Sequence, residues 1–321
     1  MRPAEIALVV LSALLHAIWS ASIKGSASPL GFNLLQLVPT LAAACVLPFF
    51  VSAAEIPTKV WAIVAGTGIC HGFYFYWLAR CLELGELSVV YPIARSAPAF
   101  LPLVAIPLLG ESISLQGGLG IAVVVAGMIA IQVDGVASSL RAKTKLEAGP
   151  EHEARFPRSE PTAGGAFTNL APGVGYAFAT LAASVGYSLC DKAAMASLNA
   201  APWSAPVPQA VVYYVLLSFA GGAVFTPLAL RRVKLGELAA LTRSELRPAL
   251  VASLVSFAGY GLILQALRTA PVSYVVATRQ TSVLFAIAIG AVRWREQPSR
   301  LRLVGALATI TGVALVAQSR S

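Results

Sequence analysis

Ten apolar stretches, each long enough to cross a lipid bilayer, constrain this chain more than any other feature. A transmembrane helix needs about 20 mostly apolar residues. Each stretch is apolar around its whole circumference, which is typical of helices in lipid or inside a bundle. They cover residues 5–23, 32–53, 60–79, 87–109, 116–133, 172–190, 208–230, 248–267, 272–292 and 301–318. Because the alternating pattern of β-barrel strands is absent, we predict an all-α polytopic membrane protein with ten transmembrane helices.

The composition excludes two other classes of protein. Charged residues make up 12% of the chain and hydrophobic residues 57%, whereas a soluble domain carries about 25% charged residues. So few charges cannot cover a water-facing surface, and so apolar a chain is not expected to be disordered. A cleaved signal peptide is a poor interpretation of residues 5–23, because nine further spans follow them.

A polar segment divides the ten spans into two groups of five. Residues 135–171 are rich in charges and contain three prolines, so we predict a linker between a first five-helix repeat, 1–134, and a second, 172–321. Five is an odd number, so two such units joined without a further crossing must lie in opposite orientations. The chain is therefore predicted to contain two inverted five-helix repeats, as many secondary transporters do.

Residue matches between the halves support this repeat. Moving the second half back by 185 positions places Glu296 on Glu111, and it also aligns two glycine pairs, Gly120 with Gly305 and Gly127 with Gly312. The first helix of each half needs a shift of 168, which places Tyr187 on Trp19. We assign the difference between the shifts to longer loops at 193–207 and 231–247.

The positive charges predict an orientation. Sixteen of the 23 lysines and arginines lie on the face that carries the linker, and five lie on the face that carries the termini. Positively charged loops stay in the cytoplasm. We therefore predict a cytoplasmic linker and two external termini, and we interpret the net charge of +9 as a topology signal rather than as a nucleic-acid-binding surface.

Several motifs then resemble a known family. They are His16-Ala-Ile-Trp19 in span one, the run from Leu87 to Ser96 in span four, Gly110-Glu111 followed by Gly120 and Gly127, and Arg279-Gln-Thr-Ser282 with Glu296 in the second half. With ten spans in two halves, the chain resembles the EamA-type branch of the drug/metabolite transporter superfamily over nearly its whole length except the linker. The resemblance implies the fold and a transport function. It leaves the substrate open, because members move amino acids, sugars, nucleotide-sugars, cations and other metabolites.

Two arginines are the strongest candidates for a substrate site. Arg95 and Arg279 lie about eight residues inside spans four and nine, where an arginine costs about 2.5–3.5 kcal/mol on insertion scales. We interpret both as facing a water-filled cavity and holding a carboxylate through bidentate contacts. The structural alternative is pairing with Glu83, Glu86 or a backbone carbonyl. The shift of 185 places Arg95 on Gln280, so the two arginines are not symmetry mates; an asymmetric solute or sequence drift would both explain this.

Polar and aromatic side chains complete the predicted substrate site. His16 and Trp19 share one helix face, and the histidine is either a proton relay, a donor to the substrate, or a neutral side chain bonded to a backbone carbonyl. Aromatic walls suit ring-bearing or cationic solutes, although packing or interfacial anchoring would explain the same residues. The predicted substrate-binding residues are His16, Trp19, Tyr74, Trp77, Tyr91, Arg95, Tyr187, Tyr260, Arg279 and Gln280.

Proline placement predicts that the two arginine-bearing spans differ in shape. Span four contains Pro92, Pro98, Pro102 and Pro107, so we expect a kink beside the pathway. Span nine has no proline between Pro271 and Pro298, so we expect the two halves to bend unequally during alternating access.

Other charged and reactive side chains are interpreted as structural. Glu111 and Glu296 lie near loop ends, where a carboxylate can cap a helix start. The pair Asp191-Lys192, at the predicted end of span six, is interpreted as interfacial. The four cysteines lie in apolar stretches without paired spacing, which favours reduced packing residues.

The sequence predicts a secondary active transporter, an exporter or exchanger in the bacterial inner membrane, that moves a small polar metabolite by alternating access. The arginines favour a carboxylate-bearing solute such as an amino acid or organic acid, and transport is expected to be driven by the solute gradient or by protons. The rival functions are a flippase for an anionic lipid-linked carrier and a non-transporting membrane sensor or scaffold. We expect no enzymatic activity, catalytic residue, cofactor, metal or nucleic-acid partner, and a monomer or homodimer.

Overall fold

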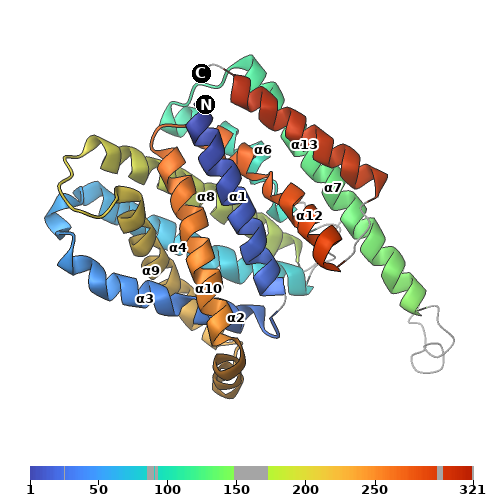
Figure 1. The fold of residues 1–321 in the computed structure, drawn as a ribbon, viewed down its shortest axis with the longest axis horizontal. Coiled ribbons are helices and arrows are strands. Elements are labelled where there is room, and N and C mark those ends of the chain that lie inside the picture. Colours follow the sequence, from blue (N-terminus) through green and yellow to red (C-terminus); the bar gives the residue numbers. More distant parts are fainter. Residues whose placement is uncertain (25, 85–89, 91–92, 148–172, 295–298, 320–321) are drawn as a thin grey trace.

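The computed structural model describes residues 1–319 except 25, 85–89, 91–92, 148–172 and 295–298. The described residues form an all-helical bundle, which confirms the predicted fold class (Figure 1). Among them, eight helical segments are long and apolar enough to cross a membrane. The α-helices are α1 (Pro3–Lys24), α2 (Pro29–Leu35), α3 (Leu37–Val46), α4 (Thr58–Leu84), α6 (Ala97–Leu109), α7 (Leu115–Glu147), α8 (Val174–Ala200), α9 (Gln209–Leu230), α10 (Leu235–Leu267), α11 (Val272–Arg279), α12 (Ser282–Trp294) and α13 (Arg300–Gln318).

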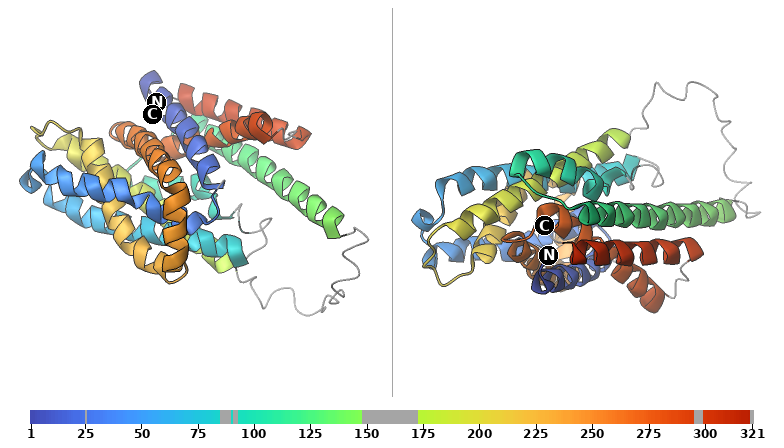
Figure 2. Two further views of the ribbon diagram at one scale, coloured as in Figure 1. Left: turned by 60° about the horizontal axis from the view of Figure 1, so that its bottom comes forward. Right: turned by 90° about the horizontal axis from the view of Figure 1, so that it is seen from above.

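Three helices extend furthest beyond the apolar spans that the sequence predicts. Helix α7 continues to Glu147, inside the segment interpreted as a linker, and projects beyond the rest of the bundle (Figures 1 and 2). Helix α8 continues to Ala200 and α10 begins at Leu235, so the loops expected at 193–207 and 231–247 are partly helical. Hydropathy marks only the apolar part of a helix, whereas residues such as Ala, Leu, Lys, Arg and Glu continue a helix into polar surroundings.

Helices α7 and α13 pack side by side through the glycines that the repeat relates (Figures 1 and 2). A β-carbon on Gly127 would lie 2.5 Å from the Gly305 carbonyl oxygen, and one on Gly120 would lie 2.8 Å from that of Gly312. The two contacts occur in opposite order along the two helices, so α7 and α13 are antiparallel. This is the contact pattern that a two-fold relation between inverted repeats produces.

Other helix pairs follow the same relation between the halves. Helix α1, the first span, packs against α10, the eighth span, and α8, the sixth span, packs against α4, the third. The main hydrophobic core lies between the repeats and contains the fully buried side chains Leu101, Tyr213 and Leu264. The two chain termini lie close together at one end of the bundle (Figure 1), which is called the terminal end below.

Three spans are interrupted near the middle of the molecule. Span two divides into α2 and α3 at Gln36, and span nine divides into α11 and α12 at Gln280 and Thr281. In span four, α6 begins at Ala97, directly after Ser96. Because Ser96 and Thr281 correspond at the shift of 185, the two arginine-bearing spans break at the same place.

Span nine is therefore interrupted although it contains no proline between Pro271 and Pro298. Proline explains the start of α6, where Pro98 occupies the first turn and needs no hydrogen-bond acceptor. Both breaks also contain a hydroxyl-to-carbonyl bond: Ser96 Oγ donates to the Ile93 carbonyl oxygen at 2.7 Å, and Thr281 Oγ1 donates to the Thr278 carbonyl oxygen at 2.9 Å. Threonine side chains compete in this way with the helical ladder.

Candidate functional site

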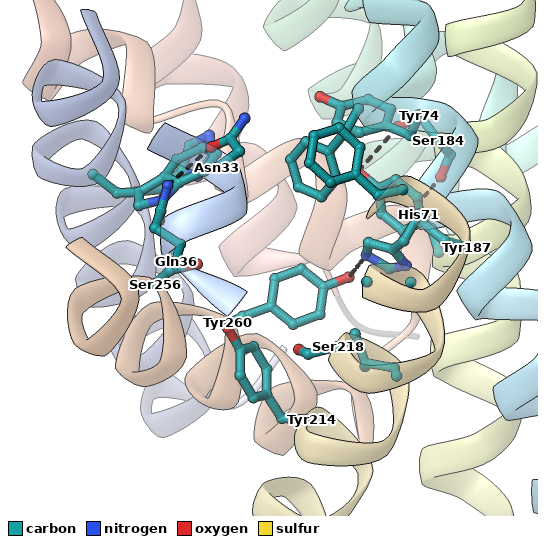
Figure 3. A pocket seen from close by; sticks show the side chains of 18 of the residues that line it. Asn33, Gln36, His71, Tyr74, Ser184, Tyr187, Tyr214, Ser218, Ser256 and Tyr260 are labelled. Atoms are coloured by element: carbon teal, nitrogen blue, oxygen red, sulfur yellow. Dashed lines mark hydrogen bonds between the residues drawn. The ribbon is translucent and has the colours of Figure 1, made fainter. Parts of the chain in front are cut away.

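A cavity of about 200 Å³ lies inside the bundle where the broken spans meet. Both repeats contribute to its wall, from α1, α2, α3, α4, α6, α8, α9, α10, α11 and α12. Figure 3 shows part of this wall, with Asn33 and Gln36 on one side and His71, Tyr74 and Tyr187 on the other. The side chain of Tyr260 lies between these groups and points toward His71 (Figure 3).

The structure brings most of the predicted substrate-binding residues together. Eight of the ten line this cavity: His16, Trp19, Tyr74, Arg95, Tyr187, Tyr260, Arg279 and Gln280. Trp77 is not part of the lining and stacks on Phe73, with ring centroids 4.7 Å apart. Tyr91 lies outside the described residues, as do Glu86 and Glu296.

Positive charge gathers at the two broken spans. Arg279 lies in the last turn of α11, and its guanidinium carbon is 5.3 Å from the centroid of the Tyr260 ring. Arg95 directly precedes the equivalent break and also lines the cavity. The ring of His16 stacks on Trp19 at a centroid distance of 5.2 Å. His16 also interacts electrostatically with both guanidinium groups. This part of the cavity therefore suits an anion.

A chain of amide groups at the break in span two faces the cavity. Trp19 Nε1 donates to Gln36 Oε1 at 2.7 Å, and Gln36 Nε2 donates to Asn33 Oδ1 at 2.9 Å. The main-chain oxygen of Gln36 accepts from Ser253 Oγ at 2.9 Å, which ties the break to α10. Sequence reasoning missed Asn33 and Gln36, although two amide side chains in an otherwise apolar span were an available signal.

The opposite wall is aromatic and contains a histidine that sequence reasoning also missed. The His71 ring stacks on Tyr187 with centroids 4.1 Å apart, and Tyr74 meets Tyr187 edge-on at 5.5 Å. Ser184 Oγ donates to the Tyr187 hydroxyl oxygen at 3.3 Å. A lone histidine in a helix carries no spacing pattern, so only the fold assigns His71 to this wall.

Asp191 lies behind the aromatic wall, and its interpretation as interfacial is wrong. Its side chain is 1% exposed. Oδ1 accepts hydrogen bonds from Thr67 Oγ1 and the Tyr213 hydroxyl, both at 2.9 Å, and Oδ2 accepts from the Tyr260 hydroxyl at 2.5 Å. The error arose because α8 continues past the predicted end of span six, which carries Asp191 into the protein interior.

Polar contacts join the two repeats at the terminal end of the bundle. Glu111 accepts from the backbone nitrogens of Val272 and Ser273 and from Ser273 Oγ, the last at 2.7 Å. The prediction that Glu111 caps a helix start is thus confirmed, and the helix, α11, belongs to the other repeat. Nearby, Thr269 Oγ1 donates to Glu5 Oε1 at 2.7 Å.

Lys192 adds a further contact at this end. Its Nζ donates to the carbonyl oxygens of Leu267 at 2.9 Å and Ala270 at 2.8 Å, so it caps the C-terminus of α10. A cation at a helix C-terminus stabilises the unpaired carbonyl groups there.

The described part of the chain contains no group of three His, Cys, Asp or Glu side chains placed to hold a metal ion. The cavity instead combines two guanidinium groups, amides, hydroxyls and aromatic faces. Such a set can bind and orient a small polar molecule through hydrogen bonds and charge.

The comparisons with known proteins agree with this architecture. Residues 3–133 and 171–318 match the EamA-like transporter family, once in each half of the chain. An "Uncharacterized transporter in cobO 3'region" from Sinorhizobium sp is 26% identical over 131 residues, which cover 39% of this chain and 93% of that protein. A solved structure described as "Crystal structure of protein" aligns with a TM-score of 0.63 and 18% identity, covering 98% of this chain and 96% of the other.

The last similarity concerns the fold alone, whereas the family match extends over most of the sequence. Two matches in one chain also identify the halves as duplicated repeats. The chain therefore belongs to the EamA-like transporter family and is a multi-pass integral membrane transporter, not an enzyme.

Proposed function

We propose that this transporter moves a small carboxylate-bearing metabolite, such as an amino acid or organic acid, by alternating access. The observation that carries the proposal is the position of Arg95 and Arg279, which line one cavity at equivalent helix breaks. Guanidinium groups bind carboxylates through paired hydrogen bonds. Among the described residues, no carboxylate oxygen lies within 4 Å of Arg279, so its donors are available to a solute.

The broken helices add to this preference for an anion. Helices α6 and α12 begin at Ala97 and Ser282, and both residues line the cavity. Helix N-termini carry partial positive charge and free N–H groups. Interrupted helices of this kind hold anionic groups in transporters built from inverted repeats.

The size and lining of the cavity limit the rest of the solute. Pockets for drug-sized molecules measure about 300–1,000 Å³, and this cavity measures about 200 Å³. A solute no larger than an amino acid or a short organic acid fits that volume. The amides of Asn33 and Gln36 and the ring of Tyr187 then supply hydrogen bonds and an apolar face for its other end.

The contacts at the terminal end supply one of the two gates that alternating access requires. Glu111, Lys192 and Glu5 each bridge elements of different spans there. Opening this end requires these charge-assisted contacts to separate together. With the orientation that the positive charges predict, this gate faces the outside of the cell.

The test is counterflow in liposomes that contain the purified protein. Liposomes preloaded with one unlabelled metabolite receive the same labelled metabolite outside, across a panel of amino acids, organic acids, sugars and amines. We expect exchange of at least one carboxylate-bearing solute and none of the neutral sugars or simple amines. Exchange confined to solutes without a carboxylate would refute the proposal.

A further inference from the structure

Asp191 is a buried carboxylate in the middle of a membrane protein, and its described contacts come from hydroxyl groups. Thr67, Tyr213 and Tyr260 donate to it, and among the described residues no lysine or arginine nitrogen lies within 4 Å of its oxygens. Burying a charged carboxylate without a cation is costly, and such residues in membrane spans often belong to ion or proton pathways.

Asp191, Thr67, Tyr213, Tyr260 and His71 form one hydrogen-bonded unit. In this unit one acceptor nitrogen is left without a hydrogen to accept. His71 Nδ1 lies 3.1 Å from the Thr67 carbonyl oxygen, which has no hydrogen to donate, so we assign the ring hydrogen to Nδ1. His71 Nε2 is then an acceptor, 3.3 Å from the Tyr260 hydroxyl. That hydroxyl has a single proton, which it already donates to Asp191 Oδ2.

We propose that Asp191, Tyr260 and His71 form a proton-binding site that couples proton movement to solute transport. The proposal rests on the proposed function. A proton that binds Asp191 Oδ2 makes that oxygen a donor to the Tyr260 hydroxyl oxygen. The Tyr260 proton then turns toward His71 Nε2, so every acceptor in the unit is satisfied and no other bond changes.

The site is connected to the cavity on one side only. His71 and Tyr260 line the cavity, whereas Asp191, Thr67 and Tyr213 do not. Tyr260 bonds the carboxylate directly and His71 reaches it through Thr67, so the content of the cavity can affect Asp191 through these two side chains. Among the described residues, the titratable or charged groups that face the unit from the helices packed around it are Cys70 on α4, Tyr187 and Cys190 on α8, Tyr213 and Tyr214 on α9, and Arg279 on α11.

Arg279 sets the sign of the coupling. Its guanidinium lies over the Tyr260 ring, 5.3 Å from the centroid. A solute carboxylate bound to Arg279 brings negative charge to this place, which favours a proton on the Asp191 unit. Coupling free energies are reciprocal, so the proton in turn favours the solute. The proton and the carboxylate-bearing solute should therefore cross the membrane in the same direction.

The first test is independent of transport. Infrared spectra of the purified protein, recorded across a pH series, should show a protonated-carboxyl band that is lost in Asp191→Asn. The matched control is Thr180→Val, which removes a buried hydroxyl on the same helix that donates to the Tyr176 carbonyl oxygen and leaves every contact of Asp191 in place. The control should keep a titrating band. A wild-type protein in which no carboxyl band depends on Asp191 would overturn the proposal.

The second test separates coupling from transport. Liposomes containing a pH-sensitive dye receive a solute that passes the counterflow assay, and an imposed proton gradient should drive its accumulation. We expect Asp191→Asn to retain counterflow but to lose accumulation and the dye signal at least tenfold, and Thr180→Val to retain counterflow, accumulation and the dye signal. Wild-type counterflow without proton movement, or with protons moving against the solute, would overturn proton coupling while leaving the proposed function intact.

Discussion

Two regions of the molecule differ in how well the internal repeat is kept at the level of side chains. One is the contact between α7 and α13, and the other is the pair of breaks in spans four and nine. In the first region the repeat relates Gly120 to Gly305 and Gly127 to Gly312, and the cross-contacts form between these same residues. In the second region the breaks coincide, but Arg95 corresponds to Gln280 and Arg279 to Ala94.

This difference separates the scaffold from the binding site. Helices α7 and α13 approach closely only if small residues lie on both helices at the contact. The glycines are therefore the same at repeat-related positions of α7 and α13. A small solute has a charged end and an uncharged end, and a symmetric wall would treat both alike. The cavity therefore uses a symmetric pair of breaks but asymmetric side chains.

Disruption of the glycine contact should have the largest effect. Gly127→Val places a side chain against the Gly305 carbonyl, and we expect a loss of stability of about 3 kcal/mol or failure to fold. Thermal unfolding in detergent, followed by size-exclusion chromatography, measures this. Gly118→Val on the same helix is the control, because a β-carbon there meets no atom within 4 Å. Equal melting temperatures for both variants would contradict the role of this contact.

Removal of an arginine from the asymmetric region should affect transport more than stability. Arg279→Ala is expected to weaken solute binding by about 2–3 kcal/mol, since it removes a charged hydrogen-bond donor from the cavity. Arg279→Lys should restore less than a tenth of the activity because an ammonium group lacks the planar pair of donors. Counterflow rates measure both. Arg268→Ala, which changes a positive charge bonded to Asn199, should transport normally; an equal loss there would point to a general charge effect.

The cross-repeat cap at α11 should have a smaller effect. Glu111→Ala removes the acceptor for the Val272 and Ser273 backbone nitrogens, and we expect a loss of about 1–2 kcal/mol. Denaturant or thermal titration tests this against Glu237→Ala, an exposed residue in the first turn of α10. If both variants lose the same stability, Glu111 does not hold the repeats together.

The smallest expected effect is on solute affinity, when an aromatic ring of the cavity wall is replaced. Tyr187→Leu removes a ring that lines the cavity and stacks on His71, and we expect about tenfold weaker solute binding. Trp77→Leu, which alters a ring outside the cavity lining, should change affinity less than about twofold. A larger loss in Trp77→Leu than in Tyr187→Leu would show that the cavity boundary is misplaced.

Much of the fold was predictable because hydropathy and residue spacing act locally. Ten spans follow from apolar length, and the arginines stand out because a charge inside a span is rare. The break in span nine was not predictable in the same way, since no proline lies between Pro271 and Pro298 to mark it. The positions of Asp191 and His71 depend on how far α8 extends and on which helices meet it, and neither property is encoded in a local pattern.

The most direct test of carboxylate binding by the cavity arginines compares an acid with its primary amide. Isothermal titration of the purified protein uses the best carboxylate-bearing solute from the counterflow panel and the amide of the same molecule. We expect wild-type protein to bind the acid at least about 30-fold more tightly than the amide, and this preference to disappear in Arg279→Gln. Equal binding of acid and amide by the wild-type protein, or an unchanged preference in Arg279→Gln, would contradict carboxylate binding by the cavity arginines.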